Sequence, residues 1–273
     1  MTTFFVFFAF PFLDICVLYN KMINKEKIRI LVLAAGLGKR MRSDLPKALA
    51  QVRGKPMIGY VLEAIHKSGV DDRPIIVVGH KKKKIMERLG EKYDYVVQEK
   101  QEGTGHAVMS AQKFMQDKAE HVLILPSDHP YVNEKTIKDL ARRHLASKTK
   151  ITMATIYLSD FKDWRVFFYN NFSRIVRDKN GEILRDVQVK DLKEEEKNIT
   201  EVNPIYLCFE AKWLWKKIKD LKTDNAQKEY YLTDLIRVAI LEGEKIESFD
   251  IDPREGLGAN SKEELETLEK FEV

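Results

Sequence analysis

Residues 28–41 read Ile-Arg-Ile-Leu-Val-Leu-Ala-Ala-Gly-Leu-Gly-Lys-Arg-Met, and Leu45-Pro46-Lys47 follows them closely. The apolar, β-branched start predicts a buried strand. That strand runs into a loop in which Gly36 and Gly38 let backbone N–H groups approach a ligand. Exposed N–H groups in succession form an anion site, to which Arg40 and Lys47 add positive charge. The stretch predicts a triphosphate-binding loop; a plain surface turn with two solvated bases is the alternative.

The spacing of this loop differs from that of two common phosphate-binding motifs. A Walker A loop needs Gly-x-x-x-x-Gly-Lys-Ser/Thr, and a dinucleotide fingerprint needs Gly-x-Gly-x-x-Gly. Here the third glycine is missing after Gly38, and no Lys-Ser/Thr pair follows. The pattern therefore indicates neither a P-loop ATPase nor a Rossmann dehydrogenase. It resembles the signature of sugar-phosphate nucleotidyltransferases.

Composition places the chain among ordinary globular proteins. It has 273 residues, of which 33% are charged and 44% hydrophobic, enough for one large core. The net charge of +5 is partly supplied by residues 81–84, four consecutive lysines that we interpret as a solvated face. No aromatic pattern accompanies them, so nucleic-acid binding is not predicted. The two cysteines, Cys16 and Cys208, suggest no disulfide framework and predict a reducing, cytoplasmic location.

Residues 1–25 form an apolar N-terminal extension that we expect to lie outside the fold. The apolar run from Phe4 to Leu18 is interrupted by Pro11 and Asp14, and it is too short to span a membrane comfortably. No lysine or arginine precedes it, unlike in a secretory signal. A mis-assigned start or a loose tail is the favoured interpretation, and a membrane anchor is the alternative. The nucleotidyltransferase domain is expected over residues 26–273.

From Ile28 onward, strands alternate with amphipathic helices. This order predicts an α/β fold with a doubly wound, mostly parallel, Rossmann-like sheet and helices on both faces. Strands are expected at 28–32, 75–78, 95–97 and 122–125, and helices at 56–68, 82–89, 105–115 and 134–146. Ligands bind beyond the carboxyl ends of such strands, where both the glycine loop and Asp128 fall.

After Lys150 the pattern becomes richer in strands, and it predicts a small β-rich lobe that binds the sugar. Strands are expected at 151–158, 174–177, 182–189, 201–210 and 245–251, and helices at 212–218, 232–241 and 261–271. Asp178-Lys179-Asn180-Gly181 is a hairpin-turn sequence. Ser261 is the predicted N-cap of the last helix, with Glu264 at the capping-box spacing.

A second informative block runs from Val97 to Ala107. Gln98 and Gln101 offer amide donors and acceptors suited to the edge of a nucleobase. Gly103 and Thr104 lead into a predicted helix N-terminus, where partial positive charge favours anions. His106 could act in acid–base chemistry, but a structural role is favoured.

Asp128 follows a buried strand and is a candidate magnesium ligand, because Mg²⁺ takes one or two carboxylates together with phosphate oxygens and waters. A turn cap at Ser127-Asp128 is the equally weighted alternative. Asn260, in the turn Gly256-Leu257-Gly258-Ala259-Asn260, could supply a second ligand.

Nearly the whole chain after residue 30 resembles the uridylyltransferase domain of bacterial N-acetylglucosamine-1-phosphate uridylyltransferases. The resemblance rests on the glycine loop with Leu45-Pro46-Lys47, Gly54-Lys55-Pro56-Met57, residues 101–108, Glu201-Val202-Asn203, and Asn225-Ala226-Gln227 with Glu229-Tyr230-Tyr231-Leu232-Thr233-Asp234. It implies a Mg²⁺-dependent reaction of UTP with a sugar 1-phosphate, N-acetylglucosamine 1-phosphate being favoured, that gives UDP-N-acetylglucosamine and pyrophosphate.

The resemblance also implies roles for individual residues. Arg40 and Lys47 would be catalytic, with Arg40 on the triphosphate. Asp128 and Asn260 would hold Mg²⁺. The nucleotide would be bound by Ala35, Gly36, Lys47, Gln98, Gln101, Gly103 and Thr104, and the sugar by Asn203, Gln188 and Ser173.

The departures from the family pattern fall on or near the sugar side. Asn171-Phe172-Ser173-Arg174-Ile175 stands where the family has Gly-Tyr-Gly-Arg-Ile, and Gln188 aligns with a sugar-binding glutamate. Pro126 replaces an expected aromatic-bearing turn, and Pro204 follows Asn203 where the family continues Thr-Gly. The transferase chemistry is thus better supported than the sugar.

Three alternatives remain open. Another phosphorylated acceptor is one, and a non-catalytic nucleotide-sugar sensor is another. A glycosyltransferase is the third, although its Asp-x-Asp motif is not found at Ser127-Asp128-His129. The family's bifunctional members continue into hexapeptide repeats, which this sequence does not contain, so no acetyltransferase domain and no trimerisation through it are predicted.

Overall fold

The computed structural model describes residues 28–271, and the predicted extension over residues 1–25 lies outside them. Its first half is a parallel sheet. Strand β1 (Ile28–Ala34) pairs with β4 (Ile75–Val78) on one side and β6 (His121–Pro126) on the other, and β5 (Asp94–Val97) pairs with β4. All three contacts are parallel. The buried β-branched runs suit a sheet that is covered on both faces.

The second half of the sheet is mixed. The strand order is β5-β4-β1-β6-β11-β7-β10-β8-β9, and β12 also pairs with β7 in parallel. Contacts from β6 through β11 and β7 to the β8–β9 hairpin are antiparallel. The bounds are β7 Ile151–Tyr157, β8 Arg174–Arg177, β9 Ile183–Val187, β10 Glu201–Val202, β11 Leu207–Glu210 and β12 Ile246–Asp250. A separate small hairpin pairs β2 (Gln51–Val52) with β3 (Lys55–Pro56).

Helices cover both faces of the sheet, as predicted. One apolar cluster packs α2 (Met57–Ser68) and α5 (Glu134–Ser147) on one face, and a second packs α4 (Thr104–Met115), α7 (Ala211–Lys217) and α8 (Asp234–Leu241) on the other. The remaining helices are α3 (Lys82–Leu89), α6 (Val166–Asn171) and α9 (Lys262–Glu269). Short 3-10 helices occupy 39–41, 47–49, 163–165, 189–191, 194–196, 218–220 and 253–256.

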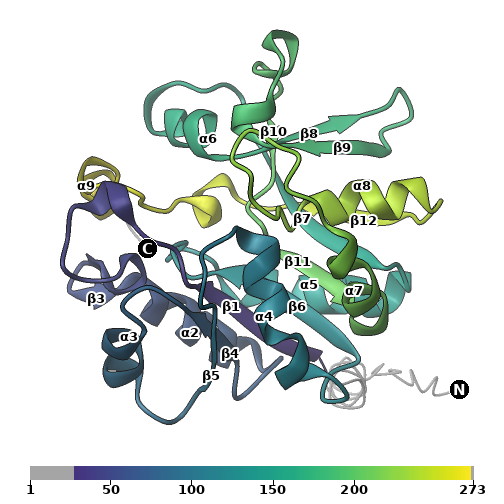
Figure 1. The fold of residues 1–273 in the computed structure, drawn as a ribbon. Helices are drawn as coiled ribbons and strands as arrows, with labels where there is room; N and C mark the ends of the chain where they lie inside the picture. The colour runs from purple at the N-terminus through teal and green to yellow at the C-terminus, as the bar shows by residue number, and fades with distance from the viewer. Residues whose placement is uncertain (1–27, 272–273) are drawn as a thin grey trace, which may run out of the picture.

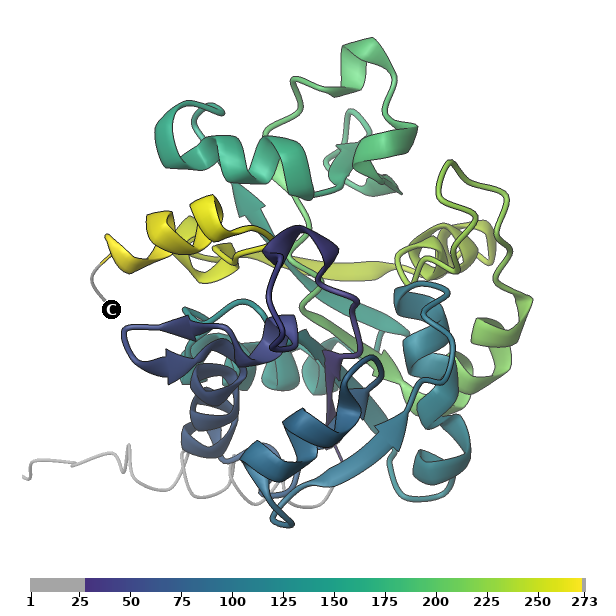
Figure 2. The same cartoon turned by 60° about the vertical axis from the view of Figure 1, so that its left-hand side comes forward.

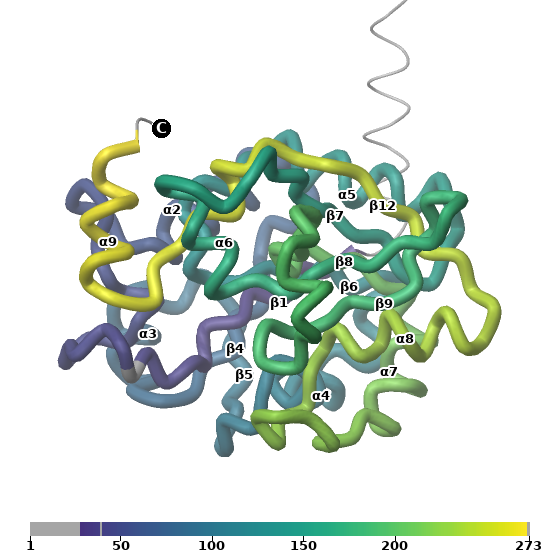
Figure 3. The backbone as a smooth tube through the Cα atoms, turned by 90° about the horizontal axis from the view of Figure 1, so that it is seen from above, coloured from purple at the N-terminus to yellow at the C-terminus, as the bar shows by residue number. Residues whose placement is uncertain are grey.

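The β8–β9 hairpin, β10 and α6 form a lobe above the main sheet (Figure 1). Figure 2 shows the glycine loop, the segment after β1, rising between the main sheet and this lobe. Seen from above, α9 lies at the edge of the molecule on the side of α2 and α6 (Figure 3). The last segment of the described chain therefore returns to the carboxyl ends of the first strands.

The expected strands and helices are present, and most of their boundaries agree within one or two residues. The single strand expected at 201–210 is wrong, because Pro204 and the turn around it divide this range into β10 and β11. The β2–β3 hairpin and α6 were not predicted. The sequence Asp178–Gly181 forms the turn between β8 and β9, where the Asp178 carboxylate accepts hydrogen bonds from the Asn180 and Glu182 backbone N–H groups. Ser261 caps α9 by accepting a hydrogen bond from the Glu264 N–H at 3.2 Å. Within residues 28–271, no helix has the length and apolarity needed to cross a bilayer.

Candidate active site

A cavity of about 670 Å³ opens at the carboxyl ends of β1 and β6, below the upper lobe. The glycine loop, the turn after β6, the N-terminus of α4, the β8–β9 hairpin and the turn before α9 all contribute to its wall. All but one of the predicted site residues line it: Ala35, Gly36, Lys47, Gln98, Gln101, Gly103, Thr104, Asp128, Ser173, Gln188, Asn203 and Asn260. The exception is Arg40.

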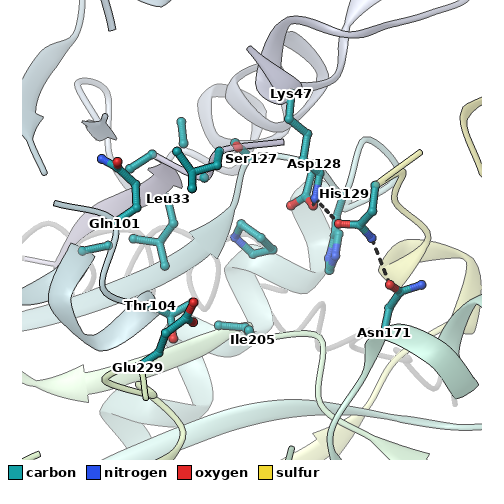
Figure 4. A pocket seen from close by; sticks show the side chains of 18 of the residues that line it. Leu33, Lys47, Gln101, Thr104, Ser127, Asp128, His129, Asn171, Ile205 and Glu229 are labelled. Atoms are coloured by element: carbon teal, nitrogen blue, oxygen red, sulfur yellow. Dashed lines mark hydrogen bonds and ion pairs between the residues drawn. The ribbon is translucent and has the colours of Figure 1, made fainter. Parts of the chain in front are cut away.

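Lys47 connects the two residues that the sequence predicts as metal ligands. Its ammonium forms an ion pair with the Asp128 carboxylate and donates a hydrogen bond to the Asn260 Oδ1 (Figure 4). The side chains of Lys47 and Asp128 are each 18% exposed. Burial on its own would raise the pKa of Asp128, but the attraction of the Lys47 ammonium, with a smaller contribution from His129, outweighs it and lowers that pKa. Asp128 is therefore an ionised carboxylate facing a cation.

Asn260 is held in place by two side chains that the sequence-based prediction did not include. The backbone N–H of Asn260 donates to the Glu264 Oε2 at 2.6 Å, and its Nδ2 donates to the Asn171 Oδ1 at 3.3 Å. Glu264 also accepts from the Asn171 Nδ2 at 3.1 Å. The predicted capping box is thus altered: the Glu264 carboxylate binds the N–H one residue before the N-cap.

Arg40 lies outside the cavity wall but reaches the same network. Its Nη2 donates to the Asn171 Oδ1 at 3.2 Å, and Asn171 in turn contacts Asn260. The guanidinium is exposed. The two basic side chains and the late amide of Asn260 therefore surround one hollow, with Arg40 at its rim.

His129 follows Asp128 but is packed as part of the cavity floor. Its ring stacks on Phe172 with the centroids 5.5 Å apart, and its Nδ1 lies 3.2 Å from the Tyr206 hydroxyl, which donates to the Glu255 carbonyl. Burial, opposed by the Asp128 carboxylate and assisted by the Lys47 ammonium, lowers the pKa of His129 to about 4. A ring that is neutral at physiological pH and wedged between aromatic side chains supports the turn.

The two glutamines that are predicted to contact a nucleobase are held in place by hydrogen bonds to the backbone. Gln98 is 3% exposed, and its Nε2 donates to the Gly103 carbonyl at 3.1 Å. The Gln101 Nε2 donates to the Gln98 carbonyl at 2.9 Å. A Cβ on Gly79 would lie 2.7 Å from the Gln101 Nε2, so a glycine is needed there for Gln101 to pack. The loop is therefore held ready for a ligand by its own hydrogen bonds.

The segment around Tyr230 supports the N-terminus of α4. The Gly105 N–H donates to the Tyr230 carbonyl at 2.7 Å, and the Leu232 N–H donates to the Thr104 Oγ1 at 3.1 Å. Gly103 has a φ of 105°, and a Cβ there would lie 2.6 Å from the Tyr230 oxygen. The Glu229–Asp234 block, the most specific part of the resemblance, thus fixes the loop that carries the predicted nucleotide-binding residues Gly103 and Thr104.

Two lysines of the basic run tie the glycine loop to α3. The Lys81 Nζ donates to the Ser43 carbonyl and the Lys84 Nζ to the Asp44 carbonyl, both at 2.9 Å. The solvated face predicted for the run therefore also holds the segment between Arg40 and Lys47.

The part of the cavity wall that is predicted to bind the sugar contains a second buried network. Asn203 is 2% exposed, and its Nδ2 donates to the Asp186 Oδ2 at 2.6 Å. The Gln188 Nε2 donates to the Thr233 Oγ1 at 2.9 Å. Burial raises the pKa of Asp186 to about 7, despite hydrogen bonding with Asn203 and Ser173 that favours the ionised form. This part of the site carries its carboxylate at position 186.

One observation supports the prediction that Asp128 and Asn260 could hold a magnesium ion. The Asp128 carboxylate and the Asn260 Oδ1 both contact the same ammonium, so two oxygen ligands already converge on one cation. One carboxylate with neutral oxygens is a set that Mg²⁺ uses together with phosphate and water. Among the described residues there is no cluster of three or more His, Cys, Asp or Glu side chains that could hold a metal without substrate.

Comparison with known families decides what kind of protein this is. Residues 30–230 match the MobA-like NTP transferase domain family. The chain belongs to this family. The matched range contains every predicted nucleotide-binding residue, and Asn260 lies beyond it. By family, the chain is an NTP transferase domain.

Curated relatives of this NTP transferase domain are bifunctional GlmU proteins. The chain is 36% identical over 241 residues to the one from Acetivibrio thermocellus and 41% identical over 241 residues to the one from Carboxydothermus hydrogenoformans, in each case over 88% of the chain. It spans 50% and 52% of their lengths. The resemblance to this family is confirmed, and it covers about half of each relative.

A solved structure supports the same fold. The chain superposes on a putative glucose-1-phosphate thymidylyltransferase from Bacillus anthracis with a TM-score of 0.69 and 16% sequence identity, covering 90% of this chain and 97% of the other. The Rossmann-like α/β class is therefore confirmed for this NTP transferase domain.

Sequence reasoning missed four side chains that shape the site: Asn171, Glu264, Asp186 and Ile205. Asn171 was visible only as a departure from the family pattern, and Glu264 only as a capping residue. Asp186 carried a signal in its spacing, because it lies two residues before Gln188 in the strand predicted at 182–189, where such residues share a face. For Ile205 no local signal exists.

Proposed function

We propose that this protein joins UTP and N-acetylglucosamine 1-phosphate to give UDP-N-acetylglucosamine and pyrophosphate. The proposal is carried by one observation: Lys47, Asp128 and Asn260 meet at a cavity that the predicted base-reading and sugar-binding residues also line. The family membership and the GlmU relatives support the reaction type. From the cysteine content we further propose a cytoplasmic location.

The proposed chemistry is an in-line displacement at the α-phosphorus of the nucleotide. An oxygen of the sugar phosphate forms the new P–O bond, and the bond to the β-phosphate oxygen breaks and releases pyrophosphate. The attacking oxygen is already anionic, so no strong general base is needed. Catalysis then consists of positioning and of charge stabilisation.

In this scheme the basic side chains act on the phosphates. Lys47 can turn from Asp128 to an α-phosphate oxygen, because its ammonium already lies at the cavity wall. Arg40 at the rim faces the departing pyrophosphate. Asp128 and Asn260 would hold Mg²⁺, which when bound neutralises phosphate charge as a Lewis acid.

The nucleobase and the sugar are assigned to opposite ends of the cavity. Gln98 and Gln101 face the base, and their amide groups favour uracil through paired donor and acceptor contacts. Asn203, Gln188 and Ser173 face the sugar. The neutral Gln188, in place of the family's glutamate, favours testing other hexose 1-phosphates as a second candidate acceptor.

The test is pyrophosphate release from a matrix of UTP, CTP, GTP and dTTP with N-acetylglucosamine 1-phosphate, glucose 1-phosphate and phosphocholine. We expect UTP with N-acetylglucosamine 1-phosphate to give the highest kcat/KM, and we expect activity to be lost when Mg²⁺ is chelated. Release with none of the twelve pairs, together with tight UTP binding, would favour the sensor alternative.

A further inference from the structure

The loop after Asn203 places an apolar side chain in the wall of the cavity. Asn203, Ser173 and Gln188 line the cavity with polar groups, and Ile205 lines it with a branched alkyl group. Figure 4 shows Ile205 on the other side of the pocket from Lys47. Ile205 is also the second residue of the Pro204-Ile205 pair that departs from the family's Thr-Gly.

The backbone of Ile205 adopts a conformation that this residue type rarely takes. Its φ is 63°, in the left-handed region. A β-branched residue is a genuine outlier there, because its Cβ substituents crowd the backbone. Such strain persists only where the surroundings over-determine the conformation, and it is concentrated at functional sites.

A short series of hydrogen bonds through Asn203 holds Ile205 in this conformation. Its N–H donates to the Asn203 Oδ1 at 2.7 Å, which closes a tight turn across Pro204. This bond fixes the orientation of the Asn203 amide, because a backbone N–H can only donate. The Asn203 Nδ2 then donates to the Asp186 Oδ2 at 2.6 Å, and the Asn203 N–H donates to the Ser173 carbonyl at 3.4 Å.

The turn therefore presents two different groups side by side. One Nδ2 hydrogen of Asn203 goes to Asp186, and the second is available to a ligand in the cavity that Asn203 lines. Two residues further on, Ile205 offers an apolar surface to the same cavity. A hydrogen-bond donor next to an apolar surface is complementary to an acetamido group, which has a carbonyl oxygen next to a methyl group.

We propose that Ile205 determines acceptor specificity by packing against the acetamido methyl of the acceptor while Asn203 donates to its carbonyl. The inference rests on the proposed function, and it gives a role to the strained isoleucine in the cavity wall. Asp186 is a positioning residue in this arrangement, since it acts through Asn203. Glucose 1-phosphate lacks the acetamido group, with both its carbonyl and its methyl, and so gains from neither contact.

The experiment compares two acceptors and two products in the full chain. Wild type, Ile205→Ala and Ile205→Gly are assayed for kcat/KM with N-acetylglucosamine 1-phosphate and with glucose 1-phosphate, and calorimetry gives the affinities for UDP-N-acetylglucosamine and UDP-glucose. Loss of a buried alkyl contact changes such a preference by about tenfold or more. We expect both variants to lose about that factor of preference for the N-acetyl compounds, with the KM for UTP unchanged.

Lys148→Gly is the matched control. Lys148 also has a positive φ, 53°, but it is the C-cap of α5, outside the residues that line the cavity. Relief of strain should raise the unfolding midpoint of Lys148→Gly as well as of Ile205→Gly. The acceptor preference should change only in the Ile205 variants.

The outcomes separate this inference from the proposed function. A preference that stays within twofold of wild type, or that rises, overturns the role of Ile205. Wild-type protein that binds both nucleotide sugars but releases no pyrophosphate contradicts the proposed reaction, and the affinity ratio then decides the inference. Failure of all variants to bind either nucleotide sugar overturns both.

Discussion

Replacing Lys47 by methionine tests the centre of the site. The change removes the ammonium that neutralises the Asp128 carboxylate and contacts Asn260, while keeping a side chain of similar length. An exposed ion pair contributes about 0–1 kcal/mol, and breaking a buried pair costs about 3–5 kcal/mol. With both side chains 18% exposed, we expect an intermediate loss of about 1–3 kcal/mol in the free energy of unfolding.

The loss should depend on the charge of Asp128. In the double variant Lys47→Met/Asp128→Asn no charge is left without a partner, so most of the loss should be recovered. Guanidinium denaturation of the wild type, both single variants and the double variant forms the cycle that isolates this coupling. Lys83→Met, which removes an exposed lysine of α3, is the control and should change stability by less than about 0.5 kcal/mol.

The same variant separates stability from catalysis. We expect turnover of Lys47→Met to fall by about 10²–10³, the usual effect of removing one group that stabilises transition-state charge. Mg²⁺ should raise the unfolding midpoint of Lys47→Met more than that of wild type, because the ammonium no longer competes for Asp128 and Asn260. Unchanged turnover would remove Lys47 from the mechanism, and additive stability changes in the cycle would refute the charge coupling.

Three further predictions concern other parts of the cavity. Between pH 3.8 and about 7, Asp186 is protonated in the folded chain and ionised in the unfolded chain, so its contribution to stability is lost as pH rises through this window. In denaturant titrations, the free energy of unfolding of Asp186→Asn should therefore match that of wild type near pH 4 and exceed it near pH 8 by at most about 4 kcal/mol. A difference that stays constant with pH would be inconsistent with the raised pKa. Gly103→Ala places a Cβ 2.6 Å from the Tyr230 oxygen at a φ of 105°. We therefore expect the free energy of unfolding to fall by at least about 1–3 kcal/mol and the KM for UTP to rise. Wild-type kinetics in this variant would show that the loop adapts. Arg40→Met should raise the KM for UTP with little change in the unfolding midpoint, whereas the same change at the neighbouring exposed Arg42 should not; equal effects would indicate a general charge effect.

The first half of the fold was predictable because its signals are local. The strands β1, β4, β5 and β6 each contain a short apolar run, and a helix follows each of them before the next of these strands, so periodicity alone orders them. The glycine loop and Asp128 could be placed at one edge because parallel strands share their carboxyl ends. The arrangement of β11, β7 and β10 could not, since antiparallel insertion into such a sheet depends on long-range pairing.

The supporting residues of the site were harder to predict for the same reason. Asn171 and Glu264 lie 93 positions apart, and their hydrogen bond exists only because α6 and the start of α9 meet above the cavity. Polar residues of these types are common on helices, and nothing in their sequence neighbourhoods marks them. The strain at Ile205 is likewise invisible in the sequence, because it follows from the Asn203 contact and not from the residue type.

The position of Asn260 has a consequence for biosynthesis. It lies 213 residues after Lys47, so a nascent chain carries the glycine loop and Lys47 long before the amide that contacts Lys47 has been translated. At ribosomal speeds of about 5–20 residues per second, this interval is roughly 10–40 s. During that time Asp128 and Lys47 can meet without Asn260, which completes their environment. A fragment released before α9 would have a cavity that is open on the side where Asn260 belongs.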